Sequence, residues 1–322
     1  LLTSIICLFL RHWGWGFMRK PFILHMFTSE KNLSPFDVNM ALDAGWIPTI
    51  PYTNVEIGEV RALVQDTIFS RSPSGLKRTG IFIGGRSALT AVEMLRVGKQ
   101  SMFAPFELCM LADPSGAFTS AAAIVALVES KLKKHHNTTL EGKSVLIVGG
   151  TGPVGQIAAV LSANAGAKTR IVGRQLEKSQ SVAETCNREF GGGKIHIEGD
   201  ADANKPALIQ TADVVMTTGA AGFQLLSAEL IAAAPLLKVA ADVNAVPPSG
   251  IAGMDPYDNG TPLAGSQSGA ISLGALAIGN VKYQTQRILL ERMRNQLLDG
   301  GKPLFLSFEE AFAVAREYLK GR

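Results

Sequence analysis

Cysteine, aromatic residues and long apolar runs are all scarce in this chain of 322 residues. The three cysteines, Cys7, Cys109 and Cys186, are few, odd in number and scattered. This pattern argues against a disulfide framework and against a cysteine-based zinc site, and it indicates a reducing compartment. The adjacent His135 and His136 would point in different directions on a helix. We therefore predict no metal site and a cytoplasmic location.

The chain also lacks a large excess of charge of either sign. Lys and Arg exceed Asp and Glu by 31 − 27 = 4, and the excess is scattered along the chain. This balance gives no reason to expect a nucleic-acid partner. Hydrophobic residues make up 47% and charged residues 18%, which excludes a disordered protein. The length predicts two domains or one large α/β unit.

The first ten residues, Leu1 to Leu10, are apolar except for Thr3 and Ser4. No basic residue precedes them and no small-residue cleavage site follows, so they do not match a signal peptide. They are also too few to span a bilayer, and no other segment is long enough, so we predict no membrane partner. Because Met18 would be an ordinary start, we interpret residues 1–17 as an upstream extension or a misassigned start, in preference to a membrane anchor.

The first half of the chain alternates between strand and helix patterns. Strands are predicted at 22–27, 46–52, 79–85 and 107–111, and helices at 34–44, 55–70 and from 87 onward. The strand at 46–52 is interrupted by proline, so we place it near a sheet edge. A long Ala-rich helix at 118–136 is apolar nearly all round, which predicts burial between two domains.

A second series of strands and helices follows. Strands are predicted at 144–149, 168–172, 194–197, 214–217 and 238–242, with helices between them and at 274–298 and 308–319. A Gly-, Pro- and Ser-rich segment at 244–272 predicts a long functional loop. We predict an α/β protein of two α/β domains, the second a Rossmann-type doubly wound parallel sheet. The predicted boundaries are 18–125 and 126–302, with the terminal helix of 303–322 packing back on the first domain.

The most specific motif is a glycine-rich turn that follows the apolar strand ending at Val148. Gly150, Gly152 and Gly155 form G-x-G-x-x-G, and a helix follows at once. Glycines permit the tight turn and the close approach of a pyrophosphate to the helix N-terminus. The predicted dinucleotide contacts here are Gly150, Thr151, Gly152, Pro153, Val154 and Gly155.

The end of the next strand indicates which dinucleotide binds. An NAD site usually has Asp or Glu there, whereas this chain has Val172-Gly173-Arg174 and no acid before Glu177. Arg174, assisted by Lys178, can pair with a 2′-phosphate. The sequence therefore favours NADP over NAD, although Arg174 also reads as an ordinary solvated cation.

Substrate is expected between the domains, beside the nicotinamide. Three loops supply candidates: 34–39 with Asp37, 111–119 with Asp113, Ser115 and Thr119, and 241–250 with Asp242, Asn244 and Pro248. We assign Asp242 to the cofactor and Asn244 and Pro248 to the substrate. Each Asp also has an ordinary structural explanation in a helix start or a turn. Lys282, in the helix after the Gly-rich loop, could equally be a solvated lysine.

Taken together, these segments resemble the NAD(P)-dependent methylene-tetrahydromethanopterin dehydrogenases of methylotrophic bacteria. The motifs are Gly150–Gly155, Val172–Arg174, Asp242–Ile251 and Gly274–Lys282, with Ile23–Met26, Ser34–Met40 and Thr79–Gly85 in the first half. The resemblance extends from about Met18 to the end. The family includes members that use both nucleotides and members restricted to NADP, and Arg174 places this chain with the NADP users.

The resemblance implies hydride transfer from a methylene pterin to NADP+ in one-carbon (formaldehyde) metabolism. It implies catalytic roles for Asp37, which would stabilise developing positive charge, and for Lys282, which would orient the pterin. Asp113, Ser115 and Thr119 would shape the floor of the site. It further implies a homo-oligomer, a trimer being one form.

Two alternatives stay open. The first is the same reaction on tetrahydrofolate, because both pterins share the reacting ring. A bifunctional folate dehydrogenase/cyclohydrolase is less favoured, because its cyclohydrolase chemistry would need a Tyr-x-x-x-Lys motif. Four residues after Tyr52 this chain has Glu56 and not a lysine. The second alternative is a non-catalytic NADP-binding sensor that keeps the glycine turn.

Overall fold

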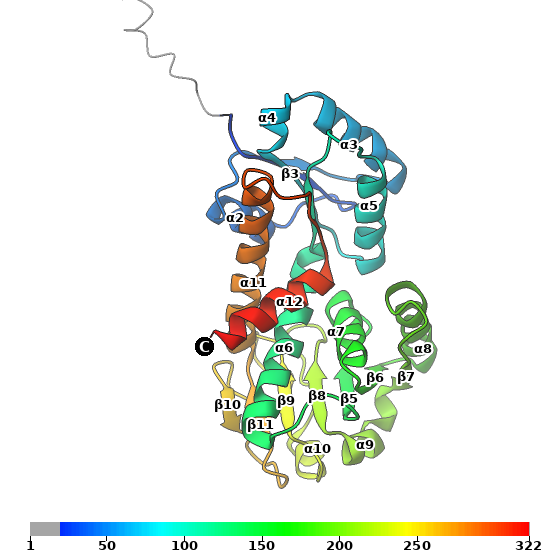
Figure 1. Cartoon of the computed structure of the whole chain (residues 1–322). Coiled ribbons are helices and arrows are strands. Elements are labelled where there is room, and N and C mark those ends of the chain that lie inside the picture. Colours follow the sequence, from blue (N-terminus) through cyan, green and yellow to red (C-terminus); the bar gives the residue numbers. More distant parts are fainter. Residues whose placement is uncertain (1–19, 322) are drawn as a thin grey trace, which may run out of the picture.

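Two separate sheets organise the computed structural model, which describes residues 20–321 (Figure 1). Our interpretation of residues 1–17 and of a start at Met18 concerns positions outside the described residues. Within residues 20–321, no helix combines the length and the apolarity needed to cross a bilayer.

The first sheet is parallel throughout and has the strand order β12-β4-β3-β1-β2. Its strands are β1 (Ile23–Phe27), β2 (Thr49–Tyr52), β3 (Thr79–Ile83), β4 (Cys109–Ala112) and β12 (Phe305–Leu306). Numbered along the chain, the order is 2-1-3-4-5, as in flavodoxin-like sheets. The proline-containing strand β2 lies at the edge, as predicted, because a proline cannot donate to a neighbouring strand.

The second sheet has the order β10-β11-β9-β8-β5-β6-β7. Its strands are β5 (Ser144–Val148), β6 (Lys168–Gly173), β7 (Ile197–Ala201), β8 (Val214–Thr217), β9 (Val239–Asp242), β10 (Asn259–Pro262) and β11 (Ile271–Leu273). From β7 to β11 the strands are parallel in the Rossmann order 3-2-1-4-5-6, so the predicted fold class is confirmed. The order reverses between β5 and β8, where such sheets bind ligands.

Two predictions for this sheet need correction. The strand predicted at 194–197 in fact spans Ile197–Ala201. The sequence pattern missed its second half because that half contains Gly199, and glycine does not favour a strand. A Cβ on Gly199 would lie 2.3 Å from the backbone nitrogen of Gln180, so only glycine fits under helix α8 (Leu176–Thr185). The predicted loop at 244–272 also ends in the short strands β10 and β11, which pair antiparallel, so the sheet is not wholly parallel.

Local sequence signals mark some of the helix boundaries. The remaining helices are α2 (Pro35–Asp43), α3 (Val60–Phe69), α4 (Pro73–Leu76), α5 (Ala88–Gln100), α6 (Ala117–His136), α7 (Pro153–Asn164), α9 (Lys205–Leu208), α10 (Ala228–Ala232), α11 (Ala275–Gln296) and α12 (Phe308–Lys320). Pro35 stands in the first turn of α2, and Gly45, with a φ of +83°, follows the end of that helix. Ser307 and Glu310 form a capping box at the start of α12.

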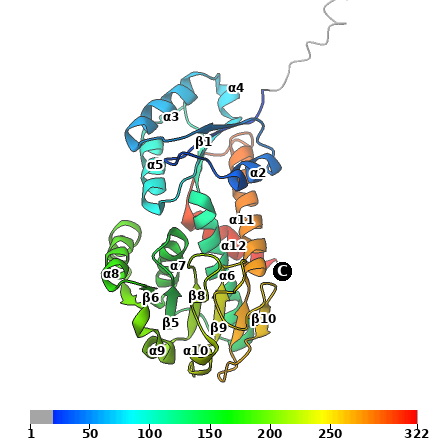
Figure 2. The same cartoon turned by 180° about the vertical axis from the view of Figure 1, so that it is seen from behind.

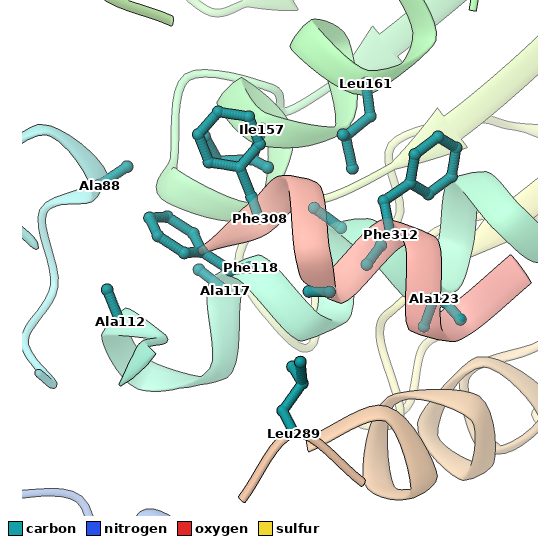
Figure 3. Packing of buried hydrophobic residues seen from close by; sticks show 14 of the residues in the cluster. Ala88, Ala112, Ala117, Phe118, Ala123, Ile157, Leu161, Leu289, Phe308 and Phe312 are labelled. Atoms are coloured by element: carbon teal, nitrogen blue, oxygen red, sulfur yellow. The ribbon is translucent and has the colours of Figure 1, made fainter. Parts of the chain in front are cut away.

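Helices α6, α11 and α12 join the two sheets into one continuous core (Figures 1 and 2). The Ala-rich helix α6 is buried along most of its length, as predicted. Strand β12 adds to the first sheet beside β4, while α12 packs against α6 and α11. Figure 3 shows Phe308 and Phe312 of α12 among side chains of α6, α7 and α11.

We expect the packing of α12 against its neighbouring helices to contribute measurably to stability. Phe308 is 3% exposed, and its ring contacts Phe118 and Phe190 at centroid distances of 5.5 and 5.8 Å. Phe308→Ala should therefore cost about 3–5 kcal/mol of unfolding free energy, whereas Phe308→Leu should cost about 1.5 kcal/mol or less. Thermal or urea unfolding measures both effects. Phe223→Ala, at a ring that is 65% exposed, is the control; a loss as large as that of Phe308→Ala would contradict the assignment.

Candidate active site

The glycine-rich turn joins β5 to α7 at the point where the sheet order reverses. A Cβ on Gly150 would lie 2.6 Å from the Ile147 carbonyl oxygen, and a Cβ on Gly155 would lie 2.4 Å from the Gly150 Cα. Gly152 is different: no atom from elsewhere in the described chain comes within 4 Å of its Cβ position. The turn is thus closed where it packs and open where a pyrophosphate would meet the N-terminus of α7.

A threonine that the sequence analysis missed faces this turn. Thr218 follows β8, and its Oγ1 is buried, with no hydrogen-bond partner in the part of the chain that the structure describes. The same oxygen lies 2.6 Å from the Cβ position of Gly155. An orphaned hydroxyl beside an open glycine turn fits a dinucleotide, which would supply the missing partner. Its place at the carboxyl end of β8, next to the switch point, was the available signal.

Arg174 and Lys178 meet beyond the end of β6. Together with Thr151 and Gln175 they line a cavity of about 260 Å³. Among the described residues, none that lines this cavity is acidic. Two exposed cations beside the same turn therefore create a positively charged pocket suited to an anionic group.

The loop after β9 is held together by its own polar groups. Asp242 Oδ1 accepts hydrogen bonds from Thr217 Oγ1 (2.7 Å) and the Asn244 amide (3.0 Å), and its Oδ2 accepts one from the Gly250 amide (2.6 Å). The Asn244 side chain accepts from the Val246 amide and donates to the Pro248 carbonyl. Pro248 itself is exposed. Asp242 and Asn244 are thus engaged in shaping this loop, and of the three residues Pro248 is presented to solvent.

Lys282 reaches the first sheet from a helix that starts at the second. Helix α11 begins just after β11, at the carboxyl edge of the second sheet, and Lys282 lies roughly 10 Å further along its axis. Its Nζ sits 3.3 Å from the centroid of the Phe36 ring. A Cβ on Gly116 would come within 2.7 Å of Lys282 Nζ, so glycine leaves room for the lysine. Phe36 and Gly116 were not among the predicted site residues.

Asp113 follows β4 at the carboxyl edge of the first sheet and is fully buried. Its Oδ1 accepts from the Phe118 and Thr119 amides at 2.9 and 3.1 Å, and its Oδ2 accepts from Thr119 Oγ1 at 2.7 Å. Asp113 therefore anchors the first turn of α6, and Thr119 acts as a hydrogen-bond donor to Asp113. Ser115 is exposed and bonds the Gly85 carbonyl at 2.7 Å, tying this segment to the end of β3.

Asp37, on α2, is only 1% exposed. Its Oδ1 accepts a hydrogen bond of 3.1 Å from Gln286 Nε2, and its Oδ2 has no partner within the described residues. Gln286 was missed by the sequence analysis. It lies four residues after Lys282, on the same face of α11, and that spacing was the available signal.

Burial sets the ionisation of this group of side chains. Burial and the nearby Asp113 raise the pKa of Asp37 to about 7, against the opposing effects of Gln286 and Lys282. Burial likewise raises the pKa of Asp113 and lowers that of Lys282. Two carboxyl groups and one ammonium group in a dry site can counter a positive charge that forms on a bound molecule. No group of three metal-ligating side chains was found among residues 20–321.

We expect Asp37 to destabilise the protein above neutral pH. Its pKa is about 7 in the folded protein against an ordinary value of 3.8. The unfolded chain holds fewer protons between these values, so stability falls as pH rises through this window. Asp37→Asn removes the penalty and should raise unfolding free energy by roughly 2–4 kcal/mol at pH of about 8, with little gain near pH 4.

Thermal unfolding at the two pH values measures this difference. Asp299→Asn removes the same charge at an exposed position and is the matched control. A melting temperature for Asp37→Asn that does not exceed that of the parent protein at the higher pH would count against a buried, strained carboxyl group.

Comparison with known proteins places this chain in a family. Residues 35–115 match the model of the methylene-tetrahydromethanopterin dehydrogenase N-terminal domain. The chain is 46% identical to the NAD(P)-dependent methylenetetrahydromethanopterin dehydrogenase of Methylorubrum extorquens over 296 residues, 92% of this chain and 98% of that protein. It is 32% identical to the bifunctional protein MdtA of the same organism, over 92% of this chain and 98% of the relative.

Solved structures agree on the fold. Shikimate 5-dehydrogenase from Listeria monocytogenes, in complex with shikimate and NAD, matches with a TM-score of 0.50. The match covers 94% of this chain and 96% of that one, at 14% sequence identity, and it speaks for the fold alone. The relative at 46% identity covers nearly the whole chain, including the segments that hold Asp37, the glycine turn and Lys282 in the structure. The chain therefore belongs to the methylene-tetrahydromethanopterin dehydrogenase family.

Proposed function

We propose that this protein oxidises N5,N10-methylene-tetrahydromethanopterin to the methenyl form, with NADP+ as the hydride acceptor. The observation that carries the proposal is the group of Asp37, Asp113 and Lys282 near the carboxyl edge of the first sheet, where α11 brings Lys282 close to the two carboxyl groups. Family membership supplies the substrate class, since a relative at 46% identity is named for this reaction.

The chemistry needs little from the protein besides position and charge. When bound, the nicotinamide accepts the hydride. No proton leaves the reacting carbon, so no strong general base is required at that atom. The oxidised pterin carries a positive charge shared by the two nitrogens of its five-membered ring. Asp37, when ionised, faces that charge with a carboxylate that is shielded from water and therefore interacts strongly. Lys282, held over Phe36, orients the pterin through a polar group.

In this proposal the two domains have separate roles. We assign residues 18–125 to the pterin-binding domain, residues 126–302 to the NADP-binding domain and residues 303–322 to a segment that returns to the first. Phe36, Ser115 and Pro248 offer exposed or half-exposed surface to the pterin, whereas Asp113, Thr119 and Asn244 support the loops beneath it. A cytoplasmic homo-oligomer, such as a trimer, completes the proposal; light scattering of the purified protein measures the subunit number.

The preference for NADP rests on the pocket of Arg174, Lys178 and Thr151. We expect Arg174→Ser to raise the KM for NADP+ by about 10–100-fold and to leave that for NAD+ nearly unchanged, because only NADP+ has a 2′-phosphate for the guanidinium to bind. Steady-state kinetics with both nucleotides measures this. Arg61→Ser, an exposed change of equal charge on α3, is the control. Equal losses with the two nucleotides would remove Arg174 as the selecting residue.

The catalytic assignment is tested by turnover of Asp37→Ala and Lys282→Ala. We expect kcat to fall by about 10²-fold or more in each, the size of effect seen when one preorganised electrostatic partner is removed. Lys302→Ala is an exposed control. Near-normal turnover in both site variants would exclude them as catalytic residues.

The same assay separates the alternatives when methylene-tetrahydromethanopterin and methylene-tetrahydrofolate are each combined with NADP+ and NAD+. Turnover chiefly with the folate would favour the folate dehydrogenase. Tight binding of NADPH with no turnover in any of the four combinations would favour the sensor.

A further inference from the structure

Two buried acceptor atoms lie on a single pair of side chains. Gln286 Nε2 donates to Asp37 Oδ1 at 3.1 Å, while Asp37 Oδ2 and Gln286 Oε1 both lack a partner within the described residues. The two side chains are 1% and 0% exposed, so bulk water does not reach them. Native proteins rarely leave such atoms unpaired, because each loses its hydration without compensation.

One proton satisfies both atoms. An ionised carboxylate and an amide oxygen are both acceptors and cannot bond each other, whereas a protonated carboxyl oxygen is a donor. A proton on Asp37 Oδ2 could then donate to Gln286 Oε1 while Gln286 Nε2 continues to donate to Asp37 Oδ1. The result is a cyclic carboxylic acid–amide pair with two hydrogen bonds, in which neither oxygen lacks a partner.

We propose that Asp37 is protonated on Oδ2 in the ligand-free protein, that Gln286 holds this proton, and that the pair ionises when the cationic methenyl pterin occupies the site. Gln286 is then a positioning residue, which sets the charge of Asp37 and does not itself touch the substrate. The inference rests on the proposed function for the identity of the cation, but the acid–amide pair does not depend on it.

The surrounding charges favour this arrangement. The charged groups that act on Asp37 are Asp113, between β4 and α6, and Lys282, on α11. With Asp113 ionised and Lys282 protonated, a neutral Asp37 leaves the empty site without net charge. With the methenyl cation bound, an ionised Asp37 restores the same balance. The pKa of Asp37, about 7, puts both forms within reach near neutral pH.

The proton balance is simple. As the cation binds, the O–H bond of Asp37 breaks, the electron pair stays on Oδ2, and the proton passes to water. Gln286 keeps its bond to Oδ1 and so retains the orientation of the carboxylate. When the product leaves, Asp37 takes a proton back from water, and no oxidant or reductant takes part.

Infrared difference spectroscopy of the protein without pterin or nucleotide tests the pair directly. We expect a protonated-carboxyl band that disappears as pH rises through about 7 and that is absent in Asp37→Asn. Gln286→Met should shift the frequency of this band, since the carboxyl O–H loses the amide oxygen that accepts from it. Gln284→Met, two residues away on the same helix, should leave the band unchanged.

The absence of a band that Asp37→Asn removes would overturn the proposal, as would a Gln286→Met protein whose band keeps the frequency of the parent protein. The second measurement adds methenyl-tetrahydromethanopterin to weakly buffered protein about one pH unit below the midpoint. We expect close to one proton released per site, and none from Asp37→Asn.

Binding without proton release would overturn the ionisation step. If this pterin does not bind at all, the proposed function fails, and the infrared result still decides the pair.

Discussion

Helix α11 can deliver Lys282 and Gln286 to the first sheet because its far end is anchored there. The indole of Trp46 donates to the Leu290 carbonyl at 3.1 Å, and Arg294 donates to the Ala44 carbonyl at 2.6 Å. The near end starts at the carboxyl edge of the second sheet. A single helix therefore spans the distance between the two sheets. Any site that needs groups from both halves depends on this helix, because a helix transmits position along its length.

The acidic side chains of the site differ in how many hydrogen-bond donors surround them. Asp113 and Asp242 are surrounded by donors of this chain, and their carboxylates organise the start of α6 and the loop after β9. Asp37 has one donor and one empty oxygen. Buried polar groups without partners reduce stability, and proteins retain them where function requires an unsatisfied group. This contrast sets Asp37 apart from the other two carboxyl groups, because its Oδ2 has no partner within the described residues.

The turn between β5 and α7 is shaped mainly by packing. Gly150 and Gly155 are packed so tightly that any Cβ would clash, whereas Gly152 faces open space and Thr218 keeps an unused hydroxyl. Arg174 and Lys178 lie beside the turn, where their positive charge adds to that of the α7 N-terminus. The glycine turn is thus ordered by steric packing, whereas burial and charge govern the group of Asp37, Asp113 and Lys282.

The sequence by itself determined the features that arise from neighbours along the chain. The glycine turn, Arg174 two residues after Val172, and the start of α2 at Pro35 all depend on local geometry, and each was predicted. Tertiary structure alone decided that Asp37 and Gln286, 249 residues apart, share a hydrogen bond, and that Asp242 turns inward to hold its loop. It also placed β12 beside β4 and admitted Gly199 to a strand. Such contacts depend on which surfaces the fold brings together, and local propensity carries no information about that.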